Sequence, residues 1–205
     1  VAIGSMSIET KRDSGDAQER ALAARLQQAE QQLIAAAKAR GSRWTLFRPT
    51  LIYGAGIDRS LSPIARFALR WHVFPLPAGA RGLRQPVHAE DLAAACVGVL
   101  EQEKCCGRTY ALGGGERLSF TAMLARVHAS LPARSLPLPI PLGVVRALLR
   151  IGHSLGLRSR HAGAIERLHR DLVADDTTAR DDFGWRPRPF HPDARAWTPA
   201  GDTSA

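Results

Sequence analysis

The chain has little cysteine and no long run of apolar residues. Its three cysteines are Cys96 and the adjacent pair Cys105 and Cys106. An odd number with one adjacent pair is not a disulfide framework and lacks the spacing of metal ligands. We therefore expect a reducing compartment and no metal site. No apolar run reaches the length of a membrane span and no signal segment opens the chain, so a cytoplasmic location is expected.

Lysine is also scarce, although the formal net charge is +9. The basic residues are almost all arginine, and they are scattered along the 205 residues. Clustered cations would indicate nucleic acid or an anionic membrane, because binding to phosphates releases counterions. Scattered arginines instead favour solvated faces, and arginine also suits small substrates that carry phosphate. Nucleic acid is therefore not the expected partner.

Alternating helical and extended patterns predict an α/β fold with a parallel sheet. A helix is expected over 17–40, because apolar residues recur at intervals of three and four, and Gly41 is a candidate for its C-terminal cap. The apolar stripe comprises Leu22, Leu26, Ala29, Leu33 and Ala37. Further helices are predicted over 61–71, 89–100, 119–130, 142–155, 162–170 and 175–183. Strands are expected over 44–48, 84–88 and 108–112, connections over 75–82 and 136–141, and an irregular tail after Pro187.

The stretch from Trp44 to Gly54 organises the rest of the chain. Its apolar run ends at Arg48-Pro49, where proline cannot donate to a sheet and biases the preceding residue toward extended geometry. A helix, a glycine, a buried strand and a loop form half of a βαβ unit, and such loops lie at the carboxyl end of a parallel sheet, where ligands bind. Residues 1–5 also have the pattern of a buried strand. Because a domain seldom begins inside its central strand, we expect the sequence to be the later part of a longer protein.

Five segments, in this order, resemble the extended and atypical short-chain dehydrogenase/reductases, especially the NAD-dependent epimerase/dehydratase group. They are residues 4–7, 48–54, 84–93, 109–119 and 182–187. The resemblance implies an α/β fold, namely the C-terminal part of a Rossmann-type doubly wound parallel sheet with a small, mostly helical substrate lobe. It assigns residues 1–115 to the later half of the NAD(P)-binding Rossmann domain, with 55–85 contributing to the substrate side. Residues 116–205 would form the small substrate-binding lobe and the tail.

The family's glycine-rich turn is missing from this sequence. In the family, that G-x-x-G-x-x-G turn and a helix N-terminus hold the cofactor pyrophosphate. Gly113-Gly114-Gly115 follows a strand, but it comes too late in the order and lacks the spacing, so we predict an ordinary turn there. The chain would then hold the nicotinamide side and the substrate side of the site, with strand–helix pairs lying upstream of Val1.

The resemblance also implies site residues. NAD or NADP would contact Gly4, Ser5, Pro49, Thr50 and Leu51. Ser5 stands where the family has the hydroxyl that orients the substrate, so it is a catalytic candidate. On the substrate side, Arg84 matches an arginine that meets a substrate diphosphate through charge-assisted hydrogen bonds, and Ser7 is a second candidate.

The family's Tyr-x-x-x-Lys pair should lie on the long helix. In the family, the lysine lowers the pKa of the tyrosine, which exchanges the substrate's proton. Glu30 matches the acid that follows this pair, which places Leu22 at the tyrosine position and Leu26 at the lysine position. Neither side chain can carry a proton. Tyr53, in the loop after the strand, is the candidate that could substitute for the missing phenol.

Three functions follow from the resemblance and the charge. The first is an NAD(P)-dependent epimerase/dehydratase-like oxidoreductase acting on a nucleotide-sugar-like or similar small polar substrate, which Arg84 and the closing segment 182–187 favour. The second is a non-catalytic dinucleotide-binding accessory subunit, which Leu22 and Leu26 favour. The third, a basic nucleic-acid-binding member, rests on charge alone.

Peripheral association with a membrane, or association with a larger complex, is left open. The predicted helix over 142–155 carries Arg146 and Arg150 on an apolar background, which suits a membrane or partner surface. Packing within the substrate lobe explains the same pattern. The sequence does not predict an oligomeric state.

Overall fold

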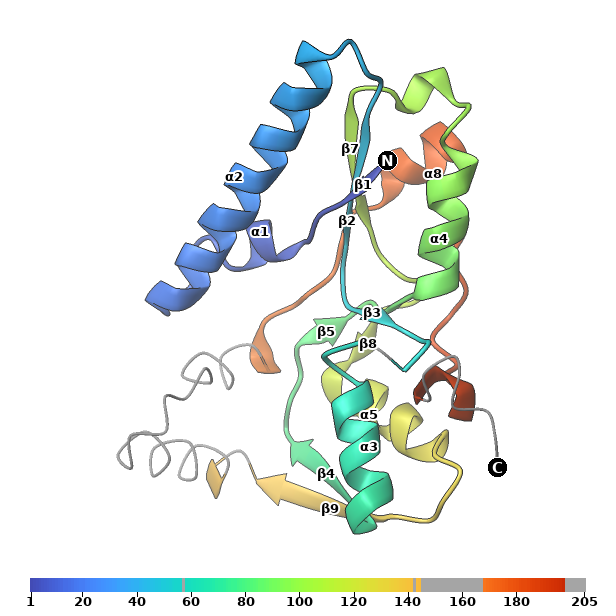
Figure 1. Cartoon of the computed structure of the whole chain (residues 1–205). Coiled ribbons are helices and arrows are strands. Elements are labelled where there is room, and N and C mark those ends of the chain that lie inside the picture. Colours follow the sequence, from blue (N-terminus) through green and yellow to red (C-terminus); the bar gives the residue numbers. More distant parts are fainter. Residues whose placement is uncertain (57, 142, 145–167, 198–205) are drawn as a thin grey trace. The chain divides into compact units, whose positions relative to one another are not determined.

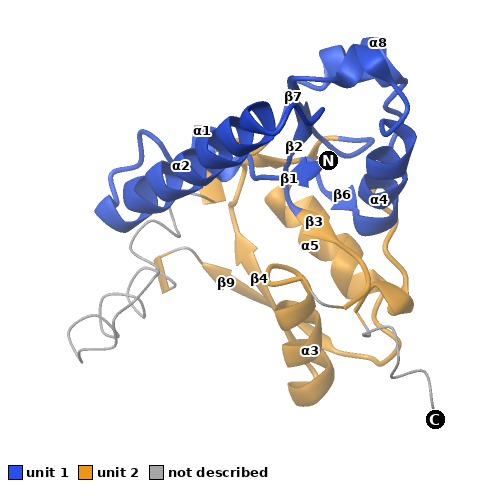
Figure 2. Ribbon diagram, turned by 45° about the horizontal axis from the view of Figure 1, so that its top comes forward, with its two compact units in different colours: residues 1–51, 85–116, 173–189 blue, residues 52–84, 117–172, 190–205 orange. Residues whose placement is uncertain are grey.

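The computed structural model describes residues 1–56, 58–141, 143–144 and 168–197 (Figure 1). The chain forms two compact units, each built from three separate segments (Figure 2). Unit 1 comprises residues 1–51, 85–116 and 173–189, and unit 2 comprises residues 52–84, 117–172 and 190–205. Most of the predicted helices over 142–155 and 162–170 lies outside the described residues, which include only 143–144 of the first and 168–170 of the second. The predicted assignment of roles to 1–115 and 116–205 stays a prediction.

Unit 1 contains a three-stranded parallel sheet in the order β1-β2-β7. The strands are β1 (Ala2–Ile3), β2 (Thr45–Pro49) and β7 (Arg108–Leu112). Phe47 lies opposite both Ile3 and Tyr110 in the register, and its side chain is fully buried. The long helix α2 (Ala17–Ala39) lies on one side of these strands, and α4 (Ala89–Gly98) and α8 (Thr177–Phe183) lie on the other (Figure 1). The predicted α/β class with parallel strands is confirmed.

Two helices of unit 1, α2 and α4, begin at polar caps. Asp16 accepts a hydrogen bond from the Gln18 amide (2.8 Å), and the His88 ring accepts one from the Glu90 amide (3.2 Å), so each side chain satisfies an N–H that has no partner inside its helix. The elements outside the three-stranded sheet are α1 (Ser7–Thr10), α2 (Ala17–Ala39), β6 (Val87–His88), α4 (Ala89–Gly98), the 3-10 helix Glu103–Cys105 and α8 (Thr177–Phe183).

The apolar stripe predicted for α2 is partly wrong. Ala29 is exposed and the side chain of Leu33 keeps 39% of its accessible surface, whereas Ala23 and Glu30 are buried. The buried face is centred on residues two helical turns apart, with Leu26 between them. Glu30 is not part of the predicted apolar stripe, and its partner Arg48 keeps this carboxylate inside.

Unit 2 contains two strands where the sequence predicted connections. β4 (Val73–Ala78) and β9 (Leu136–Pro141) pair in parallel over six residues each. Their prolines stand at alternate positions, and in a parallel strand alternate residues direct their N–H groups away from a given neighbour. The residues between the prolines can therefore still form the ladder, which is why these proline-rich segments pair rather than end the sheet.

The remaining elements of unit 2 surround this pair. Helix α5 starts at Ser119, whose hydroxyl accepts from the Ala122 amide (3.1 Å) as the sequence predicted. Phe190 and Trp197, in the tail that was predicted to be irregular, are buried. The elements are β3 (Ile52–Tyr53), α3 (Ser62–Trp71), β5 (Leu83–Arg84), its antiparallel partner β8 (Leu118–Ser119), α5 (Phe120–Ala129) and the 3-10 helix Ala194–Trp197.

No helix among the described residues has both the length and the hydrophobicity needed to cross a membrane.

The closing segment is fastened to β7 by Asp182. One carboxylate oxygen accepts hydrogen bonds from Arg108 (2.6 Å) and from the Tyr110 hydroxyl (2.8 Å), and the other lies 2.8 Å from the Lys104 ammonium. These donors, Lys104 first, hold the pKa of Asp182 below its ordinary value. Burial is the main reason why the pKa of Tyr110 is raised. Three residues after Asp182, the Trp185 indole donates to the Gly113 carbonyl (2.9 Å).

We expect Asp182 to make the stability of the protein acid-sensitive. Since the folded state favours the carboxylate, its contribution is fully present above the ordinary pKa of about 4 and is lost as the pH falls through the lowered value. Asp182→Asn should therefore lower the urea midpoint at pH 7 and flatten its decline below about pH 4. The neighbouring exposed Asp181→Asn serves as the control. If both variants decline with pH as the wild type does, this assignment is wrong.

Candidate functional site

The carboxyl ends of β1 and β2 form one corner of unit 1. The Gly4 amide donates to the Phe47 carbonyl (2.7 Å), and the Met6 amide donates to the Pro49 carbonyl (3.1 Å). These bonds continue the parallel pairing beyond the last residues of the strands. They bring Ser5 beside the Pro49–Leu51 segment, so the predicted cofactor residues are neighbours in the structure.

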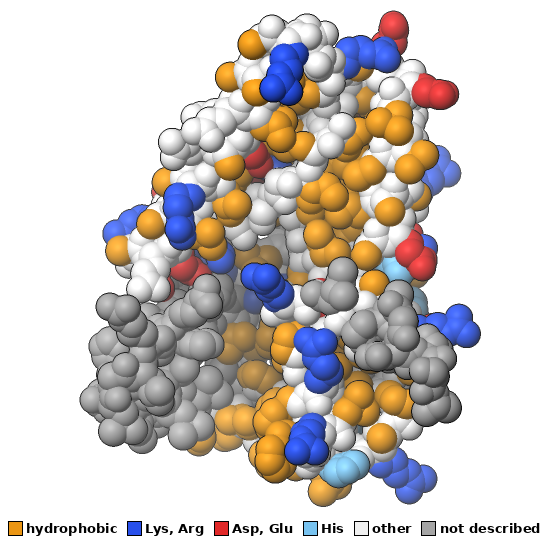
Figure 3. Space-filling view, viewed as in Figure 1, with side chains coloured by type: hydrophobic (Ala, Val, Ile, Leu, Met, Phe, Trp, Pro, Cys, Tyr) orange, Lys and Arg blue, Asp and Glu red, His pale blue; other side chains and the backbone are white. Residues whose placement is uncertain are grey.

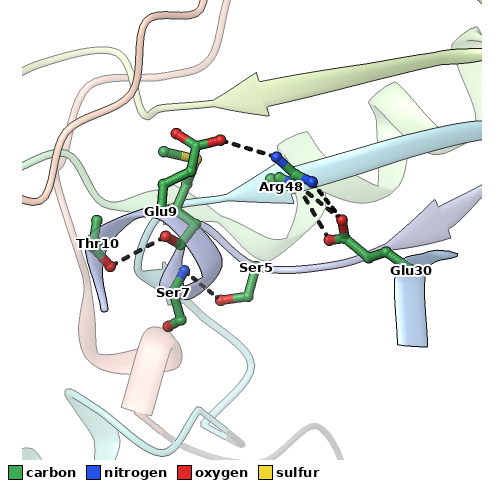
Figure 4. A network of polar contacts seen from close by, with 7 residues as sticks. Ser5, Ser7, Glu9, Thr10, Glu30 and Arg48 are labelled. Carbon is green, nitrogen blue, oxygen red and sulfur yellow. Dashed lines mark hydrogen bonds and ion pairs between the residues drawn. The ribbon is translucent and has the colours of Figure 1, made fainter. Parts of the chain in front are cut away.

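Ser5 presents a half-buried hydroxyl at this corner. Its oxygen accepts a hydrogen bond from the Ser7 amide (3.1 Å), which starts the short helix α1 (Figure 4). The Thr10 hydroxyl donates to the Met6 carbonyl (3.1 Å) and closes the turn. A serine hydroxyl has one donor hydrogen besides its acceptor lone pairs. Ser5 can therefore serve α1 and still donate to a ligand oxygen.

The guanidinium of Arg48 joins three elements at the base of the corner. Two of its nitrogens bond the Glu30 carboxylate from α2, at 2.6 and 3.0 Å to the same oxygen, and a third lies 3.0 Å from Glu9 of α1 (Figure 4). The exposed fraction of the side chain is only 8% for Glu30, 23% for Arg48 and 45% for Glu9. The hydrogen bonds to Glu30 raise the pKa of Arg48. The guanidinium of Arg48 is thus permanently charged, and its bonds to Glu30 hold α2 against β2.

Gly4 is required by the same pair. A Cβ atom at this position would overlap the Glu30 carboxylate. A larger residue in this place would therefore require the Glu30 carboxylate to shift from its position against Arg48. Gly4 has a structural reason to be here, whatever contact it makes with a cofactor.

Leu22 and Leu26 precede Glu30 by two turns and one turn of α2. Residues spaced by four lie along one side of a helix, so both leucines share the side from which Glu30 reaches Arg48. Both are half-buried. This part of α2 offers alkyl groups to its surroundings, and neither position can donate or accept a proton.

The Pro49–Leu51 segment is held by hydrogen bonds on all sides. The Thr50 amide donates to the Leu112 carbonyl (2.9 Å), the Thr50 hydroxyl donates to the Gln85 carbonyl, and the Leu51 carbonyl accepts from the Val87 amide (2.8 Å). The position of this backbone is therefore set by the strand ends around it. An ordered backbone at the end of a parallel strand offers a surface on which a flat ring can pack through van der Waals contacts.

Gln85 is a buried polar residue that the sequence analysis missed. Its amide nitrogen donates to the Gly114 carbonyl (2.9 Å), and its amide oxygen accepts from the Ala174 amide (3.0 Å). A Cβ on Gly113 would overlap this side chain, so the glycine turn after β7 packs on Gln85. The predicted turn at Gly113–Gly115 has a bend at Gly115 in the structure, and Gly113 packs on Gln85. The position of Gln85 between Arg84 and a proline gave little sign of its burial.

Tyr53 and Arg84 belong to unit 2 and are engaged there. Tyr53 is 1% exposed and packs edge-on against Phe190, with ring centroids 4.7 Å apart. Arg84 is 3% exposed, donates to the carbonyls of Leu83 (2.7 Å) and Arg170 (2.8 Å), and lies over the Phe120 ring. Their catalytic and substrate roles stay predictions. Among the described residues, no cluster of three or more His, Cys, Asp or Glu could hold a metal ion.

A parallel sheet with helices on both sides and a polar corner at its strand ends defines a Rossmann-type α/β protein. The chain belongs to the NAD dependent epimerase/dehydratase family, whose model matches residues 8–113. It is 24% identical over 162 residues to a UDP-glucose 4-epimerase of Vibrio cholerae, covering 78% of this chain and 47% of that protein. The chain thus spans about half the length of this relative.

A second relative matches a shorter part of the chain. A 71-residue segment, 34% of this chain, is 38% identical to 17% of the mitochondrial NADH dehydrogenase 1 alpha subcomplex subunit 9 of Arabidopsis thaliana.

Two solved structures share the fold. A UDP-glucuronic acid 4-epimerase from Bacillus cereus, in complex with UDP-glucuronic acid and NAD, has a TM-score of 0.61 at 12% identity and matches 91% of this chain and 55% of its own. RMD from Pseudomonas aeruginosa, complexed with NADPH, has a TM-score of 0.60 at 16% identity and matches 95% of this chain and 63% of its own. These likenesses confirm the Rossmann-type class.

We expect the Glu30–Arg48 pair to stabilise unit 1 measurably. Glu30→Gln keeps the shape but removes the charge facing a part-buried guanidinium, and this should lower the free energy of unfolding by about 2 kcal/mol. The matched control is Glu103→Gln, because Glu103 and Arg43 form an exposed pair at 3.9 Å whose loss should cost less than about 0.5 kcal/mol. Urea denaturation measures both, and equal effects would refute the special role of Glu30.

Proposed function

We propose that the protein binds a nicotinamide dinucleotide, NAD or NADP, with the nicotinamide ring against the β1–β2 corner. Membership of the family and the names of relatives solved with NAD or NADPH support this proposal. The observation that carries it is the backbone bond from the Met6 amide to the Pro49 carbonyl, which places Ser5, with its hydroxyl, beside the ordered Pro49–Leu51 segment at the ends of two adjacent parallel strands. Ligands of doubly wound sheets bind in that position.

The residues present fit one end of the cofactor. Ser5 supplies a donor, and the neighbouring strand end supplies an ordered backbone against which a ring can lie. The sequence holds no G-x-x-G-x-x-G turn that could cradle a pyrophosphate. We therefore assign to this chain the nicotinamide end only, and a bound dinucleotide would supply the hydride acceptor or donor.

We further propose that the protein is an epimerase/dehydratase-like oxidoreductase acting on a nucleotide-sugar-like or similar small polar substrate. The 78% of the chain that matches a UDP-glucose 4-epimerase supports this substrate class. Ser5 would orient a substrate hydroxyl by donating to its oxygen, and Ser7 begins α1 beside it. Since Leu22 and Leu26 cannot move a proton, the proton of that hydroxyl must pass to another group. Tyr53, which is 1% exposed in unit 2, is proposed for this role from the sequence alone.

A second candidate function is a non-catalytic dinucleotide-binding subunit. The two leucines on α2 favour it, because they replace the groups that the family's proton transfer uses. The segment shared with a NADH dehydrogenase subunit points the same way. In this case the cofactor would act as a structural element.

Removing the Ser5 hydroxyl separates the two functions. We expect Ser5→Ala in the full-length protein to lower turnover of a nucleotide sugar by about 10²-fold or more, because the substrate hydroxyl loses its donor, with NADH affinity changed little. NADH fluorescence measures binding, and product analysis over a panel of nucleotide sugars measures turnover. Thr10→Ala, one turn away on α1, is the control. Binding of NADH without turnover of any member of the panel would support the accessory subunit, and absence of binding would contradict both.

Restoring the family's pair tests the role of α2. If the leucines are what limits proton transfer, Leu22→Tyr/Leu26→Lys should raise the turnover of a nucleotide sugar by at least about ten-fold while NADH affinity stays the same. Leu22→Phe/Leu26→Met, which adds no group that can carry a proton, is the matched control. An equal change in both double variants would show that packing, not proton transfer, is affected.

A further inference from the structure

Helix α3 of unit 2 carries two different stripes on its outward side. Pro63, Phe67 and Trp71 are spaced by four residues, and so are Arg66 and Arg70 beside them. All five are exposed, whereas Ser62, Ala65 and Ala68 are buried and face the rest of the unit. The helix thus packs through small residues and turns its large aromatic and basic side chains outward.

The apolar stripe is large and well defined. Trp71 keeps 64% of its accessible surface and Phe67 keeps 47%, and their rings lie 6.5 Å apart. A further exposed apolar residue lies near the end of the helix: the Leu136 amide of β9 donates to the His72 carbonyl (2.8 Å), and Leu136 is 75% exposed. An isolated exposed apolar residue needs no explanation, but several on and beside one helix indicate an interaction surface.

The charges beside this stripe have one sign. No acidic residue occurs in α3, and Arg66 and Arg70 form no ion pair within the part of the chain that the structure describes. Arg66 donates to the Gly56 carbonyl (3.1 Å), and Arg70 lies 5.9 Å from the centre of the Trp71 ring. Figure 3 shows basic and hydrophobic side chains interleaved over the front of this helix.

We propose that the outward face of α3, made up of Phe67, Trp71 and Leu136 with Arg66 and Arg70, docks the protein on an anionic lipid surface. Tryptophan and phenylalanine lie at the boundary between headgroups and acyl chains, where a ring is buried while its rim stays near water. Arginines alongside at the same height meet lipid phosphates, and each basic residue near the surface strengthens binding. The one-sided charge complements anionic headgroups.

The same features disfavour nucleic acid as the occupant. Stacking platforms for single strands alternate with a positively charged groove that follows the backbone. Here the exposed aromatic rings are accompanied by an exposed leucine near the end of α3, which gains from burial in acyl chains and not from stacking on bases. A second copy of the chain would bring four arginines together, and they would repel one another.

Vesicle co-sedimentation of the full chain tests this proposal. We expect binding to vesicles of phosphatidylglycerol with phosphatidylcholine, weakening as salt is raised, and little binding to phosphatidylcholine alone. Arg66→Glu/Arg70→Glu should weaken the partition constant by about ten-fold or more, and Phe67→Ser/Trp71→Ser should do the same. The control Arg25→Glu/Arg40→Glu makes the same change in net charge in unit 1 and should weaken binding by no more than about two-fold, because these arginines are not part of the proposed face and act only through screened, non-specific attraction.

A spectroscopic readout keeps the test independent of the folding of these variants. The tryptophan emission should shift to shorter wavelength on adding anionic vesicles, and Trp71→Phe, which replaces one of the four tryptophans, should lose most of that shift while still sedimenting. The proposal is overturned if anionic vesicles do not bind, if the control weakens binding as much as the α3 variants, or if the Trp71→Phe shift persists. It is also overturned if the α3 variants change only self-association in sedimentation velocity and leave vesicle binding intact.

Discussion

The ion pair between Arg48 and Glu30 is the constraint on which the arrangement of unit 1 depends. It joins the middle of a long helix to the end of the central strand, and the carboxylate is almost completely buried. A part-buried charge is tolerated only with its partner in place, so the pair sets the rotation of α2 about its axis. The spacing of the helix places Leu22 and Leu26 on the side of Glu30. A Cβ at Gly4, the residue after β1, would overlap the carboxylate that the pair holds in place.

In unit 1, the residues that position the proposed site differ from those that would carry out its chemistry. The scaffold is complete in the described part of unit 1: two strand ends joined by backbone hydrogen bonds, a serine hydroxyl with donor capacity, and an ordered segment after Pro49. The proton-carrying pair is absent, because leucines occupy its places on the helix. Binding of a dinucleotide and orientation of a substrate hydroxyl are therefore better supported than a complete catalytic cycle, and the enzyme and accessory-subunit proposals differ only in what moves the proton.

Local signals predicted the elements that local chemistry decides. The proline after Arg48, the glycine at 41 with φ of 62° and the serine at 119 each act within a few residues, and the structure has the predicted strand end, helix end and helix cap at these places. The sequence misled where a distant partner decides. Glu30 is buried because of a residue 18 positions away, the strands of unit 2 tolerate proline because of their register with each other, and Gln85 is buried because it pairs with backbone groups 29 and 89 positions along the chain.

Hydrogen–deuterium exchange of the full-length protein, with and without saturating NADH, tests the central claim most directly. If the nicotinamide lies against the β1–β2 corner, residues 4–10 and 48–51 should exchange more slowly in the presence of the cofactor, because their amides become shielded and their local opening is suppressed. Unchanged exchange in both segments, together with clear protection elsewhere in the protein, would show that the cofactor binds but that this corner does not receive it.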